Sequence, residues 1–344
     1  MADVDVVIPV HGGLPALRRC VESVLAARCR TAHRVVLVDD GNTDPQLVAY
    51  LAELASSGRV QVVVQEARQG MAASVNRAFD LDRDRDVVVL HSDAQVAGDW
   101  LDRLARHAAA RDVGVVATFT NSVGVATYPR AASANPLPPG HTAGTLDAAF
   151  ARANAGAAVA LPAVDGPCLY FRRECVRVVG ALDANPLGGD YGVETDFCLR
   201  AGSAGYRHLL AGDVFVGHEG HASFGAREAE SAAARADLAL AKLYPSYPAS
   251  RRAIVEQEPQ RAFARRVDLL RLAESGKRLL VFVSHPWGGG IRRYMNDLAA
   301  LTDARCEVLF LEPAAGDTVK LSWPRAGESF ALYFTLPGDL PLLA

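Results

Sequence analysis

Short runs of β-branched residues alternate with segments of helical periodicity in the first third of the chain. The runs predict strands at Val4–Val10, Val35–Val38, Val60–Val64 and Asp86–Leu90. The segments between them predict helices that begin near Leu14, Gln46 and Gly70. Strands that alternate with helices usually pair in parallel. The pattern therefore predicts an α/β fold with a mostly parallel, doubly wound sheet.

The middle of the chain is less regular. Residues 121–162 are rich in Pro, Gly, Ala and Asn, and we expect an excursion over the sheet with a short helix at Leu146–Ala155. Periodic segments then predict a strand, two helices, a strand and a helix at Cys168–Phe171, Arg173–Val179, Glu194–Ala204, Val214–Val216 and Ala226–Leu243. Pro and Ser after Leu243 indicate a boundary.

A second strand–helix–strand pattern follows this boundary. Arg278–Val283 and Glu307–Leu311 predict strands on either side of a glycine-rich loop and a helix at Ile291–Leu301. We therefore expect one domain over residues 1–245, a helical linker over 246–276 and a partial Rossmann-like segment over 277–344. This last segment is too short to close such a domain, so we expect the chain to be part of a longer protein.

Composition narrows the class of protein. Half of the 344 residues are hydrophobic and the formal net charge is -3, which provides no basic field for nucleic acid. The six cysteines form no C-x-x-C pair, which predicts reduced thiols in a cytoplasmic protein. The N-terminus lacks the pattern of a signal peptide, and no apolar run approaches the roughly 18 residues of a membrane span. Any membrane contact, at the inner face, would be peripheral.

Polar residues follow several predicted strands. Asp39 and Asp40 end the second strand, where they can accept hydrogen bonds from a base or a ribose, or simply form a turn with Gly41. Asp93 follows the fourth strand, where a carboxylate can bind a divalent cation that also holds a diphosphate. The alternative for Asp93 is a helix cap. Because ligands bind at the carboxyl ends of parallel strands, the placement favours a small-molecule site.

Two further candidates lie later in the chain. Glu194 and Asp196 begin a predicted helix after a glycine-rich approach, so one can face an acceptor pocket while the other stabilises the helix start. His218 follows a strand and is flanked by glycine, a setting that suits a ligand to metal or phosphate. A structural histidine is the alternative, and His221 is a nearby competitor.

Together these motifs resemble the family 2 glycosyltransferases, which have a GT-A fold, over residues 4–245. The matching segments are Val7–Val10, Val38–Asp44 (the family's V-D-D-G-S-T-D, with Asn42 for Ser), Gly70, Asn76, His91–Asp93 (the D-x-D motif, with His91 for the first Asp), Tyr191–Arg200 (with Val193 for Glu) and His218–Phe224. The resemblance implies an inverting transfer of a sugar from a nucleotide diphosphate, with Mg²⁺ or Mn²⁺ as the cofactor.

The resemblance also implies site roles. Glu194 takes the place of the base, and Asp93 with His218 that of the metal ligands. It implies donor binding by Pro9, Val10, Asp39, Asp40, Gly70, Asn76, Ser92 and Asp93, and acceptor binding by Gly166, Tyr191 and Gly192. The acceptor it implies is a growing glycan or a lipid-linked glycan.

Two shorter resemblances refine this expectation. Thr120–Pro129 resembles a segment of bacterial polysaccharide rhamnosyltransferases, which favours dTDP-rhamnose as donor and a surface polysaccharide such as O-antigen as product. Ser284–Ile291 resembles the start of a family 4 glycosyltransferase of the GT-B type. The alternatives are a nucleotidyltransferase, although Val10–Leu14 lacks the basic residues of a triphosphate loop, and a non-catalytic sugar-binding module of an assembly complex.

Overall fold

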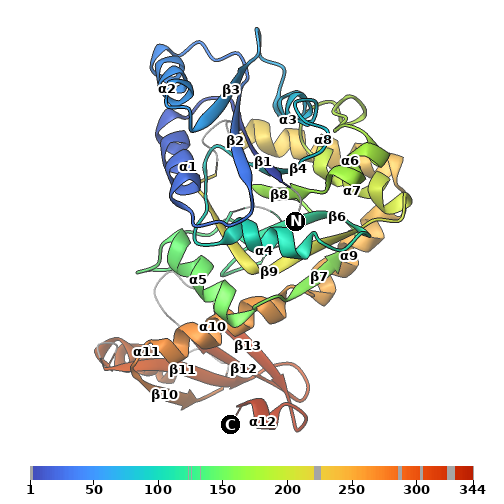
Figure 1. Cartoon of the computed structure of the whole chain (residues 1–344). Coiled ribbons are helices and arrows are strands. Elements are labelled where there is room, and N and C mark those ends of the chain that lie inside the picture. Colours follow the sequence, from blue (N-terminus) through green and yellow to red (C-terminus); the bar gives the residue numbers. More distant parts are fainter. Residues whose placement is uncertain are drawn as a thin grey trace. The chain divides into compact units, whose positions relative to one another are not determined.

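The computed structural model describes residues 3–122, 124, 126–131, 133–220, 226–285, 289–302, 305–323 and 330–343 (Figure 1). The side chains of residues 226–230, 330, 342 and 343 are not described. The chain divides into two compact units. The first comprises Met1–Leu137 and His141–Phe263, and the second comprises Pro138–Gly140 and Ala264–Ala344.

One large sheet organises the first unit. Its strands are β1 (Val4–Val10), β2 (His33–Asp39), β3 (Val60–Val64), β4 (Asp86–Leu90), β5 (Ala94–Gln95), β6 (Val113–Thr120), β7 (Ala158–Leu161), β8 (Cys168–Phe171) and β9 (Arg207–His218). In the described residues their order is β3-β2-β1-β4-β8-β6-β9-β5, with β7 also paired to β9. The first four strands pair in parallel, as do β6 and β9, whereas β8 is antiparallel to both of its neighbours. The predicted α/β class is thus confirmed, with a mixed second half.

Helices cover both faces of this sheet. They are α1 (Leu14–Ala26), α2 (Pro45–Ser56), α3 (Met71–Phe79), α4 (Trp100–His107), α5 (Ala143–Ala153), α6 (Arg173–Val179), the 3₁₀ turn η1 (Asn185–Leu187), α7 (Val193–Ser203), α8 (Ala226–Leu243) and α9 (Tyr247–Gln257). Apolar residues of α1, α2 and α4 pack on alternate residues of β1, including Val6 and Ile8. On the other face, Phe79 of α3 and Phe197 of α7 both contact Phe171 of β8. Because helices cover both faces of the sheet, its central strands are buried, and this explains their continuous runs of apolar residues.

Three strands of the first unit were not predicted. These are β5, β6 and β7. The prediction also gave β9 as Val214–Val216, although it extends from Arg207 to His218. Two polar residues, His208 and Asp213, interrupt the apolar run of β9 but are buried. Their partners, the Cys198 carbonyl and His107, come from distant segments, so the local pattern did not reveal the strand.

The second unit contains a smaller sheet. Its elements are β10 (Arg278–Val283), α11 (Gly290–Thr302), β11 (Cys306–Pro313), β12 (Thr318–Trp323), β13 (Phe330–Thr335) and α12 (Leu340–Leu343), and α10 (Arg261–Glu274) precedes them. Strands β10 and β11 are parallel and joined by α11, as the repeated pattern predicts. Strands β12 and β13 then extend the sheet in antiparallel order, which was not predicted. Among the described residues, no helix is long and apolar enough to cross a bilayer.

Candidate active site

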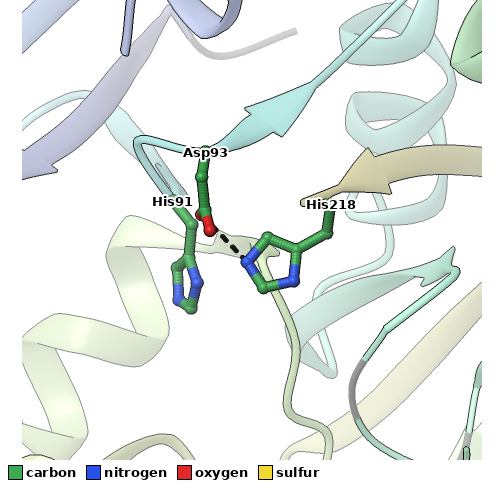
Figure 2. A group of neighbouring side chains, drawn as sticks. All are labelled: His91, Asp93 and His218. Atoms are coloured by element: carbon green, nitrogen blue, oxygen red, sulfur yellow. Dashed lines mark ion pairs between the residues drawn. The ribbon is translucent and has the colours of Figure 1, made fainter. Parts of the chain in front are cut away.

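Three potential metal ligands meet at the carboxyl ends of β4 and β9. His91 and Asp93 follow β4, and His218 ends β9. Figure 2 shows Asp93 and His218 pointing toward one another with His91 alongside, and Asp93 Oδ1 lies 2.9 Å from His218 Nε2. One ligand atom from each residue lies within 4.8 Å of the other two. The structure therefore brings together the two predicted ligands and the residue whose role the sequence left open.

Backbone pairing and hydrogen bonds hold His218 in place. The short strand β5 pairs with the end of β9, which sets Ala94 opposite His218. Asn121 accepts a hydrogen bond from the His218 amide at 2.8 Å and donates one to its carbonyl at 3.0 Å. The Ser122 hydroxyl contacts His218 Nδ1, leaving Nε2 directed at Asp93. Such outer contacts typically orient the imidazole of a metal ligand.

The protonation of the cluster suits a metal. Burial, and to a lesser extent the neighbouring His218, lower the pKa of His91 to about 4, so His91 is neutral near pH 7 and its ring can ligate. For Asp93, burial by itself raises the pKa, but the hydrogen bond and charge of His218 outweigh burial and the pKa lies below its usual value. Two imidazoles and one carboxylate fit a divalent cation. This donor set favours a transition metal such as Mn²⁺ over Mg²⁺, which prefers oxygen.

Asp39 and Asp40 occupy different environments at the end of β2. Asp39 Oδ1 accepts hydrogen bonds from the amide and the side chain of Asn42, at 3.0 and 2.6 Å. Asp40 Oδ1 accepts one from the Gln69 amide at 2.7 Å, and Asp40 Oδ2 lies 2.9 Å from His11 Nδ1. Asp39 thus shapes the turn, whereas Asp40 joins three segments at the strand ends.

Several neighbours on the donor side are fixed by backbone contacts. Val10 ends β1 after Pro9, and its carbonyl accepts a hydrogen bond from the Asn42 side chain at 2.7 Å. Ser92, which lies between His91 and Asp93 in the sequence, is buried. Both polar atoms of the Asn76 side chain bond to the backbone of Leu182, at 2.8 and 2.9 Å. The Asn76 side chain, predicted to bind the donor, therefore holds the backbone at Leu182.

Asp190 ties the acceptor loop to α3. Its two carboxylate oxygens accept hydrogen bonds from the amides of Met71 and Ala72, at 2.8 and 2.9 Å. A negative charge at a helix N-terminus is stabilising. Gly70 precedes the helix with φ +95°, and a Cβ there would lie 2.4 Å from Asp190 Oδ2. The Gly70 amide also donates to Asp40 Oδ2 at 3.1 Å, so one short segment links the two sides of the site.

Glu194 lies in the first turn of α7 and is partly exposed. The helix begins after Gly192, whose φ of +80° favours glycine. Desolvation by the surrounding protein, together with the smaller effects of the charges of Asp165 and Asp190, raises the pKa of Glu194 to about 7. This pKa matches the requirement for a general base near neutral pH.

The other acidic residue of this turn has structural partners. Asp196 is buried, pairs with Arg200 at 2.8 Å and accepts a hydrogen bond from the Tyr244 hydroxyl at 2.6 Å. The predicted acceptor residues Tyr191 and Gly166 are both partly exposed. Gly166 has φ +140° and no atom within 4 Å of an added Cβ, so its conformation rather than lack of space favours glycine.

Comparison with known families identifies the family of this chain. The sequence model of glycosyl transferase family 2 matches residues 5–176, which are 172 of the 344 residues. The chain belongs to glycosyl transferase family 2. The match ends before β9, so it contains His91 and Asp93 but neither Glu194 nor His218.

Solved structures share the fold of this family 2 chain. One is GalNAc-T7 with UDP, GalNAc and Mn²⁺, with a TM-score of 0.50, 19% identity, and coverage of 63% of this chain and 44% of the other. Another is the mannosyltransferase PcManGT from Pyrobaculum calidifontis with GDP-Man and Mn²⁺, with a TM-score of 0.50, 19% identity, and coverage of 88% and 82%. At such identity the likeness concerns the fold, which is that of GT-A glycosyltransferases.

Two curated relatives match part of the chain. An uncharacterized protein, y4gI, of Sinorhizobium fredii is 26% identical over 243 residues, which are 67% of this chain and 26% of that protein. Glycosyltransferase GlyG of Streptococcus pneumoniae is 27% identical over 113 residues, 33% of this chain and 37% of that protein. The family 2 chain thus covers 26% and 37% of the length of these two relatives.

The sequence did not assign several residues of this site. His91 stood in the metal motif but its role was open, and Asn121, Ser122 and Asp190 received none. A histidine two positions before a metal-binding aspartate was the available signal for His91. Nothing local marks the other three, because their partners lie about 100 residues away in sequence. His221 lies outside the described residues.

Proposed function

We propose that this chain transfers a sugar from a nucleoside diphosphate sugar to a hydroxyl group of a glycan, with inversion at the anomeric carbon. The observation that carries the proposal is the cluster of His91, Asp93 and His218 at the carboxyl ends of β4 and β9. In an α/β sheet this edge is where ligands bind. Mn²⁺ and a nucleotide accompany both fold neighbours, which supports a divalent cation and a nucleotide sugar here.

The residues divide the work between two sides. On the donor side, Asp40 and the residues around it would bind the nucleoside, and the cluster would hold the cation. When bound, a divalent cation neutralises the charge of the diphosphate leaving group. On the acceptor side, Glu194 would accept the proton of the attacking hydroxyl. The acceptor oxygen forms its bond to the anomeric carbon as the bond to the diphosphate breaks, and this single displacement inverts the configuration.

The finer assignments remain part of the proposal. The resemblance of Thr120–Pro129 to rhamnosyltransferases supports dTDP-rhamnose as the first donor to test, and a surface polysaccharide or lipid-linked glycan as acceptor. The parallel pair β10 and β11, joined by α11, supports the start of a family 4 domain after residue 277. Pro286, Trp287 and Gly288 of its glycine-rich motif lie outside the described residues.

Calorimetry with dTDP, UDP and GDP, each with and without Mn²⁺, tests the donor site. We expect one diphosphate to bind in a Mn²⁺-dependent manner, and Asp93→Ala to weaken this binding at least tenfold because a charged ligand is lost. Asp84→Ala removes an exposed aspartate that pairs with Arg177, and this variant should bind the diphosphate as the wild type does. Unchanged Mn²⁺-dependent binding by Asp93→Ala would contradict the metal assignment.

The identity of the bound metal provides a second test. His91→Asp would replace an imidazole by a carboxylate, the harder ligand. We expect the ratio of Mg²⁺ affinity to Mn²⁺ affinity to rise in this variant, because Mg²⁺ prefers oxygen ligands. Competition between the two ions for the protein, followed by electron paramagnetic resonance of Mn²⁺, measures that ratio. An unchanged ratio would place His91 outside the coordination sphere.

A further inference from the structure

A cavity of about 270 Å³ lies between α7, α9 and the loop before β8. Its polar lining includes Ser122, Asp165, Thr195, Tyr247 and Arg251. Apolar side chains complete it, among them Ile254 of α9. Pockets that enclose drug-sized ligands typically have about 300 to 1,000 Å³. This cavity is therefore of a size for one small unit such as a single sugar.

The cavity adjoins both halves of the candidate active site. Ser122 lies in its wall, and the hydroxyl of Ser122 contacts Nδ1 of the metal-cluster residue His218. Thr195, in the same wall, directly follows Glu194 in α7. A molecule in this cavity would therefore be close to the cluster on one side and to the first turn of α7 on the other.

The charged residues of the cavity, Asp165 and Arg251, favour neutral over anionic ligands. Asp165 accepts no hydrogen bond from any other residue that the structure describes, and it is exposed to the cavity. Arg251 is close enough for its charge to act on Asp165, but it also pairs with Asp237 at 2.8 Å. The carboxylates of Asp165 and Asp237 thus both lie near the guanidinium group of Arg251. An anionic ligand would meet net repulsion, whereas a neutral ligand with several hydroxyl groups would find both an acceptor and a donor.

We propose that this cavity binds the acceptor and that it selects an uncharged sugar unit, with Asp165 and Arg251 as specificity-determining residues. The inference rests on the proposed glycosyltransferase function. Asp165 would accept hydrogen bonds from sugar hydroxyls, Arg251 would donate them, and Ile254 would contact the apolar face of the ring. Tyr247, Arg251 and Ile254 lie beyond the residues matched by the family model.

Saturation-transfer NMR on the whole chain tests the cavity without metal. The probes are methyl glycosides of neutral hexoses, 6-deoxyhexoses and N-acetylhexosamines, with methyl glucuronide and glucose 6-phosphate as anionic counterparts. We expect transfer to at least one neutral glycoside and none to the anionic probes. Asp165→Asn and Arg251→Gln should each raise the Kd of the neutral glycoside by about 10- to 100-fold, the usual effect of losing a charged hydrogen-bond partner.

Two further variants test whether the glycoside binds in this cavity. Arg252→Gln changes an exposed arginine that does not line the cavity and should leave glycoside binding unchanged. Ala134→Trp fills the cavity from an exposed position and should abolish binding while the melting temperature holds. Binding of no neutral glycoside, or unchanged binding by Asp165→Asn, Arg251→Gln and Ala134→Trp, would overturn the proposal.

Donor binding is measured separately by calorimetry with dTDP, UDP and GDP in Mn²⁺. The cavity variants should bind the diphosphate as the wild type does, because none of them touches the cluster. Failure of the wild type to bind any diphosphate would instead overturn the proposed function, whatever the glycosides do. The two proposals therefore fail in different measurements.

Discussion

At the scale of single residues, two neighbouring acids in α7 differ in their surroundings. Asp196 is buried and paired with Arg200 and Tyr244, so its carboxylate is occupied by the protein. Glu194 makes no side-chain hydrogen bond to another residue in the part of the chain that the structure describes, and its pKa is raised to about 7. Of the two, Glu194 is therefore better suited to proton transfer, because its pKa lies near neutral pH.

Glu194→Gln should reduce sugar transfer by about 10²- to 10⁴-fold, because glutamine retains the size of the side chain but cannot accept the proton. Nucleotide-sugar binding should remain, since the donor is held elsewhere. Transfer rate and calorimetric donor affinity would be measured on the same preparation.

Asp196→Asn is the matched control for this experiment. It breaks a buried pair, so it should lower the free energy of unfolding by about 3 to 5 kcal/mol while the folded fraction still turns over. Near-normal transfer by Glu194→Gln together with loss of transfer in folded Asp196→Asn would move the base to Asp196.

The pH profile provides an independent measurement of the base. Because the pKa of Glu194 is raised to about 7, its carboxylate form increases as pH rises through neutrality. We expect kcat/KM to rise about tenfold per pH unit below this pKa and to level off above it. The residual activity of Glu194→Gln should lack this rise. A rise with the same midpoint in the variant would show that another group titrates.

At the scale of elements, α3 connects the donor and acceptor sides. Its N-terminal segment binds Asp40 through the Gly70 amide and Asp190 through the amides of Met71 and Ala72. In the middle of the helix, Asn76 holds the backbone of Leu182. The loop that carries Tyr191 and leads to Glu194 in α7 is therefore anchored at two points on α3, and the start of α3 also contacts Asp40.

Asp190→Ala should release this loop. Loss of a capping carboxylate costs about 0.5 to 2 kcal/mol of stability, and the freed loop should raise the acceptor KM more than the donor Kd. Hydrogen exchange of residues 185–194 would rise. Asp183→Ala is the control, because Asp183 is exposed on the same loop and its side chain accepts a hydrogen bond from the nearby Asn185 amide. Equal effects on donor and acceptor would contradict a role in loop positioning.

At the scale of the whole chain, the first unit extends to Phe263, beyond the predicted domain end at residue 245. The Phe263 ring is buried, lies 6.2 Å from the Phe119 ring and packs where a Cβ on Gly212 would come within 2.8 Å. Its carbonyl accepts a hydrogen bond from Asn154. Helix α9, which lines the acceptor cavity, precedes it in the same unit.

Truncation tests this boundary. A chain that ends at Glu274 should fold and keep donor binding, because it retains Phe263 and α9. A chain that ends at Pro245 loses both, and Phe263→Ala in the longer truncation should cost about 3 to 5 kcal/mol of stability. Melting temperature and calorimetric nucleotide affinity would be compared among the three. Equal stability of the two truncated chains would return the boundary to residue 245.

The sequence by itself determined the α/β class, the four parallel strands at the start and the positions of Asp93 and Glu194 relative to their strand and helix. These features follow from local periodicity, since alternating runs of apolar residues fix which segments become strands. The resemblance on Val38–Asp44, His91–Asp93 and Tyr191–Arg200 then indicated family 2, and the family match confirms that membership. The roles of the site residues stay predictions.

Only the tertiary structure decided how these residues meet. The pairing of β5 with β9 brings His218 to Asp93 across 125 positions of sequence, and Asp190 reaches α3 across 118 or more. The pKa of Glu194 depends on desolvation and on the charges of Asp165 and Asp190, which no local pattern contains. Contacts of this kind join segments that are remote in sequence, and their energy depends on burial and geometry that exist only in the folded chain.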